Sequence, residues 1–316
     1  MLSVIIPCYN SQPILREMIR LINIEINKLP VDGCEIILVN DASPNKNTLP
    51  FLKELATENS NITLIDLVKN GGQPNAQMAG LNYATGDFII NMDDDMQTHP
   101  QNIPALYHKL QEGYDVVWGK YTNKKHSPFR CLLTKMCSIF DKSILGLPKN
   151  IDLTSFWIIR KYVRDEMINY KGPYAYIGGL ILRSSNPNNI TNKEIEHFER
   201  EQGASGYNLY RLIKLWSNFT NFTILPLRVT GVIGILVSML SFIYLIFLIL
   251  QKIFIPDIVL GFTSIMAIIL FFFGLVLISL GTIGEYIGRI YMIINGQPQY
   301  IIKEVIHSSN DNTSNH

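Results

Sequence analysis

The sequence predicts an α/β fold, in which a domain with a mainly parallel sheet is followed by a hairpin of two membrane-spanning helices. Two observations carry this prediction. Over residues 2–92, short apolar runs rich in β-branched residues alternate with segments of helical periodicity, which is typical of βαβ units. Further along the chain, the 56 residues of 229–284 hold only two charged side chains, Lys252 and Asp257.

The composition limits the class of protein. Of the 316 residues, 47% are hydrophobic and 17% are charged, whereas soluble domains have about a quarter of their residues charged. The shortfall lies mostly in residues 229–284, so an ordinary domain is joined to a segment that avoids charge. This pattern excludes a disordered chain and a disulfide-stapled miniprotein. The net charge of +1 argues against bulk binding of nucleic acid, and we expect no nucleic-acid partner.

Cysteine spacing and the N-terminus both indicate a cytosolic domain. Cys8, Cys34, Cys131 and Cys137 lack the C-x-x-C spacing of zinc and redox sites, so we expect them to be reduced. The N-terminus enters its first apolar run without a preceding basic segment, which predicts no signal peptide.

The alternation of patterns predicts the elements of the sheet domain. Apolar runs predict strands at residues 2–6, 35–39, 62–68 and 88–92. Helical periodicity and turn signals predict helices at residues 14–29, 48–57 and 75–84. Ligands bind at the carboxyl ends of the strands in such sheets, so we expect the chemistry in the turns after Ile6, Val39 and Met92.

Two uncharged stretches predict the membrane segment. Residues 229–250 and 258–284 each exceed the roughly 20 residues that cross a bilayer, and the short turn between them contains a helix-breaking proline. Basic residues lie on the outer flanks of this hairpin, at Arg211, Lys214 and Arg228 before it and at Arg289 and Lys303 after it. The positive-inside rule then predicts a multi-pass membrane protein whose N-terminal domain lies in the cytoplasm, and we expect the inner (cytoplasmic) membrane.

The same patterns divide the chain into parts. We expect a cytosolic domain at 1–206, an amphipathic interfacial region at 207–228, two transmembrane helices within 229–284, a juxtamembrane segment at 285–305 and a disordered tail at 306–316. Gly281, Gly284 and Gly288 share one helix face, where small residues allow a second helix to approach closely. That second helix belongs either to the same hairpin or to another subunit, and the sequence leaves both open.

A run of three carboxylates follows the strand predicted at residues 88–92. In extended chain Asp93 and Asp95 point the same way, which suits one hard cation, Mg²⁺ or Mn²⁺, held together with substrate phosphates. The alternative is a solvated acidic turn. Asp41 closes another strand, where it can accept hydrogen bonds from a nucleobase or ribose, or can cap its own turn.

Three motifs resemble glycosyltransferase family 2, the inverting A-fold enzymes. They are residues 4–10 (Val-Ile-Ile-Pro-Cys-Tyr-Asn), 40–43 (Asn-Asp-Ala-Ser) and 93–97 (Asp-Asp-Asp-Met-Gln). Four further segments are similar to the polyprenyl-phosphate glycosyltransferases, the bactoprenol- or dolichol-phosphate sugar synthases: residues 69–81, 112–119, 200–207 and 284–291. The resemblance covers about residues 1–305, and it implies an A-type, Rossmann-like domain ahead of the membrane hairpin.

The resemblance also implies roles for individual residues. The nucleoside is expected at Pro7, Tyr9 and Asp41, and the metal and donor diphosphate at Asp93 and Asp95, with Asp94 beside them. Gln97 is expected near the donor sugar or acceptor phosphate, and Arg200, Ser205 and Tyr207 near a phosphate. Lys124, Lys125 and Arg130 are candidates for holding the acceptor phosphate, although they equally fit contact with anionic lipid or a solvated loop. A homo-oligomer, such as a tetramer, is also implied.

The sequence departs from the group's pattern at four positions. Asp94 stands where the group usually has the alanine of Asp-Ala-Asp, which is a conservative change. Asn40 stands where the group commonly has an acidic residue, and Tyr121 stands near a position that is often arginine. Ser155 replaces an acidic residue that is sometimes proposed as the catalytic base, and Asp152 is the candidate to substitute for it. The change at Ser155 need not abolish activity, because a lipid phosphate is mostly deprotonated at neutral pH and needs no base.

The expected function is therefore metal-dependent, inverting transfer of a sugar from a nucleotide sugar to a polyprenyl phosphate at the cytoplasmic face of the membrane, with undecaprenyl phosphate as the expected acceptor. The product would be a lipid-phosphate-linked sugar for surface glycan or lipid modification. Three alternatives are weighed against it. Transfer to a sugar hydroxyl by a polysaccharide synthase lacks its Gln-x-x-Arg-Trp motif here, and a nucleotidyltransferase lacks its glycine-rich loop. A catalytically impaired scaffold is supported only by Asn40 and Ser155.

Overall fold

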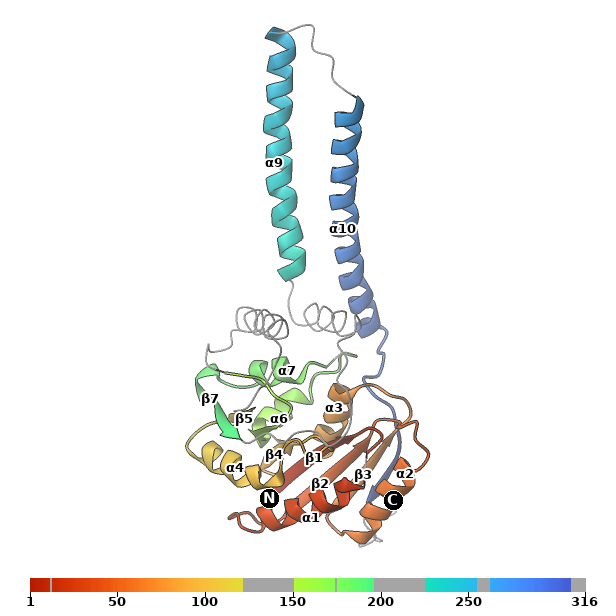
Figure 1. The fold of residues 1–316 in the computed structure, drawn as a ribbon, viewed down its shortest axis with the longest axis vertical. Coiled ribbons are helices and arrows are strands. Elements are labelled where there is room, and N and C mark those ends of the chain that lie inside the picture. The colour runs from red at the N-terminus through yellow and green to blue at the C-terminus, as the bar shows by residue number, and fades with distance from the viewer. Residues whose placement is uncertain (12, 122–150, 174, 196–224, 255–261, 308–316) are drawn as a thin grey trace. The chain divides into compact units, whose positions relative to one another are not determined.

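The computed structural model describes residues 1–11, 13–121, 151–173, 175–195, 225–254 and 262–307. The chain divides into two compact units, residues 1–208 with 297–316, and residues 209–296. The first unit is built on an eight-stranded sheet of order β7-β5-β6-β4-β1-β2-β3-β8 (Figure 1). Its strands are β1 (Leu2–Cys8), β2 (Cys34–Asn40), β3 (Ile62–Leu67), β4 (Phe88–Asn91), β5 (Val116–Tyr121), β6 (Trp157–Arg160), β7 (Ile190–Ile195) and β8 (Ile302–His307).

The sheet is mixed, with a parallel centre. The pairs β1–β2, β1–β4, β2–β3 and β5–β7 are parallel, whereas β3–β8, β4–β6 and β5–β6 are antiparallel. The predicted α/β class and the first four predicted strands are confirmed. Their carboxyl ends meet at one edge of the sheet, where the turns after β1, β2 and β4 lie together.

Helices cover both faces of the sheet. They are α1 (Ile14–Ile26), α2 (Thr48–Glu58), α3 (Gln73–Tyr83), α4 (Ile103–Gln111), α6 (Lys161–Met167) and α7 (Ile177–Arg183), with 3₁₀ turns η1 (Pro100–Asn102) and η2 (Pro187–Asn189). The periodic apolar side chains of α1 pack with α2, α4, Val4 and Ile6 in one buried cluster. On the other face, Gly80 of α3 lies so close to Ile5 that a Cβ there would be 2.5 Å from Ile5 Cγ2. That contact packs α3 directly against β1 and β2.

The segment after residue 294 differs from the sequence-based expectation. The sequence predicts a juxtamembrane segment to residue 305 and a disordered tail from 306, but residues 302–307 form β8 and pair antiparallel with β3. The run contains the β-branched residues Ile302, Val305 and Ile306, and Ile306 packs against the main core cluster. Adding β8 satisfies the backbone groups along the edge of β3, which would otherwise be exposed. The unit that holds the sheet is therefore discontinuous in sequence.

The second unit contains two long helices, α9 (Leu225–Phe254) and α10 (Phe262–Ile294). Among the described residues, one stretch, Phe271–Ile294, is long and apolar enough to cross a membrane. The helix continues beyond the expected end at 284, and there Glu285 and Arg289 lie on one helix face and form an ion pair. Of the turn predicted at residues 251–257, residues 251–254 instead continue α9, and residues 255–257 lie outside the described part of the chain.

Candidate active site

Three tight turns meet at the carboxyl ends of β1, β2 and β4. Each contains a non-glycine residue in the left-handed region, namely Asn10 (φ 56°), Ala42 (φ 47°) and Met96 (φ 57°), and no other described non-glycine residue has positive φ. Such a conformation costs about 1 kcal/mol or more and persists where surrounding contacts hold it. The strained backbone of the described chain is thus concentrated where the sequence predicts the chemistry.

These turns enclose a cavity of about 410 Å³. Six of the predicted site residues line it: Pro7, Tyr9, Asp41, Asp93, Asp94 and Asp95. Four lining residues were not predicted, and they are Cys8, Asn70, Gly72 and Gln73. The last three lie where β3 connects to α3, in a segment that the family resemblance covers without assigning a role to any of its residues.

Asp93 is the most enclosed of the three carboxylates. Its Oδ1 accepts a hydrogen bond from Gln73 Nε2 at 2.6 Å, and its Oδ2 accepts one from Ser155 Oγ at 2.5 Å. Burial raises the pKa of Asp93 to about 6; the Ser155 bond opposes this rise, and the negative charges of Asp95 and Asp94 add to it. A cation bound beside these groups would relieve both the burial cost and the repulsion.

Asp94 and Asp95 lie in a turn and not in extended chain, so the alternation argument for Asp93 and Asp95 does not apply. The Ser11 hydroxyl donates to Asp94, whose pKa is raised mainly by burial. Asp95 Oδ1 accepts from the backbone N–H of Gln97 at 3.2 Å. All three carboxylates nevertheless line the same cavity. Within the described residues, no group of three or more His, Cys, Asp or Glu side chains is arranged to hold a metal ion.

Asp41 links the turn after β2 to the β3–α3 loop by hydrogen bonds. Its carboxylate oxygens accept hydrogen bonds from the backbone N–H groups of Gly71 (2.7 Å) and Gly72 (2.9 Å). Burial raises the pKa of Asp41, and these two bonds oppose the rise. The residue expected to read the nucleoside therefore also anchors the β3–α3 loop against the turn after β2.

A hydroxyl cluster borders Asp93 on the side of β5 and β6. The Tyr121 hydroxyl lies 3.2 Å from Thr98 Oγ1 and also hydrogen-bonds Ser155. Burial raises the pKa of Tyr121, and the charge of Asp93 adds to the rise. Asn91 Nδ2 donates to the carbonyl of Ser155 at 2.6 Å, so both the backbone and the side chain of Ser155 are fixed. Two of the departures noted in the sequence, Tyr121 and Ser155, are thus direct neighbours.

Asp152, the proposed substitute base, is held elsewhere. Its backbone N–H and carbonyl bond the side chain of Asn192, both at 2.8 Å, and its carboxylate lies 3.8 Å from Lys120 Nζ. It does not line the cavity that holds the three carboxylates, and neither does the side chain of Gln97. The remaining predicted residues fall outside the described part of the chain: Arg200, Ser205, Tyr207, Lys124, Lys125 and Arg130.

Comparison with known families identifies this architecture. Residues 3–183 match the model of glycosyl transferase family 2, which is more than half of the chain. The chain belongs to glycosyl transferase family 2. It is accordingly a glycosyltransferase that uses a nucleotide-sugar donor.

Solved structures that are similar to the chain share little of its sequence. Glucosyl-3-phosphoglycerate synthase from Mycobacterium tuberculosis, solved with Mn²⁺, UDP and glucosyl-3-phosphoglycerate, is 16% identical over 68% of this chain and 75% of its own, with a TM-score of 0.47. The same enzyme with phosphoglyceric acid gives 15% identity over the same shares and a TM-score of 0.49. TarS residues 1–349 from S. aureus, with UDP-GlcNAc, is 19% identical over 69% of this chain and 66% of its own, with a TM-score of 0.45.

Within this glycosyltransferase, a neighbouring side chain explains why position 40 holds an amide and not an acid. Asn40 Nδ2 donates to Asp66 Oδ1 at 2.6 Å, and both side chains are buried. An acidic residue at position 40 would place a second carboxylate against Asp66, so the amide is what this neighbour requires. Asp66 is not foreseeable from the sequence, because it lies inside a strand and carries no motif.

Proposed function

We propose that this glycosyltransferase transfers a sugar from a nucleotide sugar to a polyprenyl phosphate, with inversion at the anomeric carbon, at the cytoplasmic face of a membrane. The observation that carries the proposal is the joining of two features in one chain. A carboxylate-lined cavity stands at the carboxyl ends of β1, β2 and β4, and the long apolar helices α9 and α10 follow it in the sequence. The first suits a water-soluble donor, and the second suits an acceptor that stays in lipid.

The donor is assigned to the cavity. Its nucleoside would lie beside Pro7, Tyr9 and Asp41, where Tyr9 is half exposed and offers an aromatic face. Asp93 and Asp95 would hold Mg²⁺ or Mn²⁺ together with diphosphate oxygens, the usual ligand set of these ions in nucleotide sites. The fit rests on the enclosed carboxylates, whose burial and mutual repulsion a cation offsets. When bound, the ion supplies charge stabilisation to the leaving diphosphate.

The acceptor chemistry needs no side-chain base. A phosphate monoester has its second pKa near about 6 and is mostly ionised at neutral pH. Its oxygen would form a bond to the anomeric carbon while the bond from that carbon to the nucleoside diphosphate breaks. Ser155 and Tyr121, which border Asp93, are neutral, and Asp152 is paired with Lys120. Arg200 and the group Lys124, Lys125 and Arg130 are proposed to hold the acceptor phosphate.

The membrane assignment extends the same proposal. Helices α9 and α10 would form a two-helix hairpin in the inner membrane, with the catalytic unit in the cytoplasm, as the basic flanks favour. The glycine face of α10, formed by Gly281, Gly284 and Gly288, would serve helix packing in a homo-oligomer.

Product analysis tests the proposal directly. The full-length enzyme in detergent is incubated with Mn²⁺, labelled sugar nucleotides of uridine, guanosine and cytidine, and undecaprenyl phosphate. We expect one donor to give a labelled lipid that depends on metal and has the opposite anomeric configuration. Transfer to free sugars or oligosaccharides, with none to undecaprenyl phosphate, would instead establish a sugar-hydroxyl acceptor.

Two variants locate the reaction in the cavity. Asp93→Asn and Asp95→Asn should each lower the transfer rate by about 10²-fold or more, because each removes charge at the proposed metal. The matched control is Asp32→Asn, which neutralises an exposed carboxylate in the turn before β2. Full metal-dependent activity in both cavity variants would show that the metal lies elsewhere.

A further inference from the structure

A buried carboxylate connects the last strand of the sheet to the donor cavity. Asp66, on β3, is 2% exposed and lies beside β8, the strand that follows α10 after residues 295–301. Its Oδ2 lies 3.6 Å from Nζ of Lys303 on β8, while its Oδ1 accepts from Asn40 Nδ2 at 2.6 Å. A buried carboxylate is costly without a cationic or hydrogen-bonding partner, and Asp66 has one of each kind.

The contact continues from Asn40 into the turn after β2. Asn40 uses its amide N–H for Asp66, which leaves its carbonyl Oδ1 facing Ser43. That oxygen accepts from Ser43 Oγ at 2.6 Å and from Ser43 N at 3.3 Å. Asp66 therefore fixes which way the Asn40 amide faces. The reversed amide would put its N–H groups against Ser43 and its oxygen against the Asp66 carboxylate.

Ser43 then joins this turn to the one after β1. Its Oγ accepts from the backbone N–H of Asn10 at 3.0 Å, and Asn10 Oδ1 accepts from the N–H of Asn45 at 3.1 Å. Asn10 and Ala42 are both in the left-handed region, so these bonds hold backbone that would otherwise relax. The two turns carry Tyr9 and Asp41, which line the cavity.

We propose that Lys303 is a positioning residue for the nucleoside end of the donor site, acting through Asp66, Asn40 and Ser43 on the turns that carry Tyr9 and Asp41. This inference rests on the placement of the nucleoside in the proposed function. It makes the strand beyond the membrane helices part of the donor site, although none of its residues lines the cavity.

The residues of β8 offer a matched control. Lys53 on α2 forms an ion pair with Glu304, the neighbour of Lys303 on the same strand. Lys53→Met and Lys303→Met each remove one lysine and one ion pair of β8, but only Lys303→Met leaves Asp66 without its cation. A purely structural role of the strand predicts equal effects, whereas the positioning role predicts an effect of Lys303 alone.

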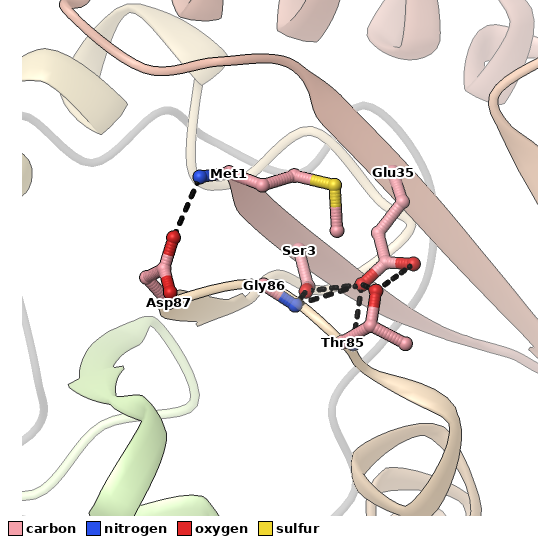
Figure 2. A network of polar contacts seen from close by, with 6 residues as sticks. All are labelled: Met1, Ser3, Glu35, Thr85, Gly86 and Asp87. Atoms are coloured by element: carbon pink, nitrogen blue, oxygen red, sulfur yellow. Dashed lines mark hydrogen bonds and ion pairs between the residues drawn. The ribbon is translucent and has the colours of Figure 1, made fainter.

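The first measurement is hydrogen exchange of the full-length enzyme without ligand. In Lys303→Met, peptides covering residues 9–11 and 40–45 should exchange about tenfold faster, because the N–H groups of Asn10 and Ser43 lose fixed acceptors. The amides of Thr85 and Gly86 serve as an internal reference. They are bound by Glu35 in a separate network at the start of β1 and β4, which Figure 2 shows, and should not change.

The second measurement is affinity for UDP, GDP and CDP with Mn²⁺, by titration calorimetry. For the nucleotide that the wild type binds, Lys303→Met should weaken binding and raise the donor KM by about tenfold, with kcat changed less than about twofold. Lys303→Arg should restore both values. Combining Lys303→Met with Asp66→Asn should recover most of the affinity, because the neutral amide introduced on β3 needs no cation and can still accept from Asn40.

The outcomes separate this inference from the proposed function. Unchanged exchange at residues 9–11 and 40–45 in Lys303→Met would overturn the positioning role, as would equal changes in Lys53→Met. If the exchange changes but the wild type binds none of the three nucleotides, the connection stands and the placement of the nucleoside is wrong. Failure to use undecaprenyl phosphate affects neither measurement.

Discussion

Ser155 Oγ donates to Asp93 Oδ2 across 2.5 Å, so the residue that replaces the expected acid holds a member of the carboxylate triplet in place. The Asn91 amide fixes the Ser155 backbone, at 2.6 Å from its carbonyl oxygen. A carboxylate at position 155 would face Asp93 directly. In this chain the serine is therefore a hydrogen-bond donor to Asp93, a role that a carboxylate could fill only when protonated.

Substitution of Ser155 tests this relationship. Ser155→Ala should lower kcat/KM about tenfold, because a hydrogen bond to a charged group is lost. Ser155→Asp should move the acid limb of the pH–rate profile about one unit upward, since two adjacent carboxylates retain a proton to higher pH. Rates measured from about pH 5.5 to 8.5 distinguish the two. A Ser155→Asp enzyme faster than the wild type would mean that the reaction does use a base at this position.

The raised pKa of Asp93 predicts how stability depends on pH when metal is removed. Burial raises this pKa from 3.8 to about 6, so the folded state holds the proton more tightly than the unfolded chain. The contribution of Asp93 to the free energy of unfolding is then fully present below about pH 4. About 3 kcal/mol of this free energy is lost as pH rises through 6. Asp93→Asn lacks this loss. In EDTA at about pH 7.5, the melting temperature of the variant should be higher than that of the wild type. The two melting temperatures should approach each other at about pH 4.5.

Adding Mn²⁺ provides the control for that experiment. Bound metal stabilises the ionised wild type but not Asp93→Asn, so it should reverse or remove the difference at about pH 7.5. Equal melting temperatures of both proteins at every pH in EDTA would contradict the burial of an ionised Asp93.

Loss of the Asp41 carboxylate should release the β3–α3 loop. Asp41→Ala leaves the N–H of Gly71 without its acceptor and leaves the N–H of Gly72 with only Asn70 Oδ1, at a cost of about 1–3 kcal/mol in stability. Donor affinity should fall with it. The matched control is Asn70→Ala, which removes only a 3.2 Å bond to Gly72 in the same loop. Thermal unfolding compares the two variants, because Asn70 itself lines the donor cavity, and equal losses of stability would refute the anchoring role.

The contact between α3 and β1 gives a prediction about stability alone. Gly80→Ala would put a Cβ 2.5 Å from Ile5 Cγ2 and 3.3 Å from Val39 Cγ2, and overpacking of this kind costs about 1–3 kcal/mol. The melting temperature should fall. Because Ile5→Ala removes the Ile5 Cγ2 atom, the double variant should lose less stability than the sum of the two single variants.

The sequence predicts the elements whose signals are local. The apolar runs of β1 to β4 and the periodic face of α1 indicate their own structure, and the rule for carboxyl ends places Asp41 and Asp93 at one site. The sequence does not predict β8, because that strand pairs with β3, whose residues lie more than two hundred positions earlier. Pairing over such a distance leaves no local signal.

The roles of three further site residues cannot be read from the sequence, for a different reason. Gln73, Ser155 and Tyr121 are neutral, and each matters only because folding brings it to Asp93. The sequence marks Ser155 and Tyr121 only as departures from the family pattern, and it does not mark Gln73. The carboxylate of Asp152, near the expected position, instead pairs with Lys120, and Asn192 hydrogen-bonds the backbone of Asp152.

The pairing of β8 with β3 also affects how the protein is made. The catalytic sheet keeps an open edge at β3 until synthesis has passed both long helices and reached residues 302–307. An uncovered strand edge is a template for association with other chains. Residues 1–208 expressed alone should therefore aggregate, whereas the same fragment supplied with a peptide of residues 297–307 should stay soluble. The catalytic sheet is thus completed only after both long helices have been made.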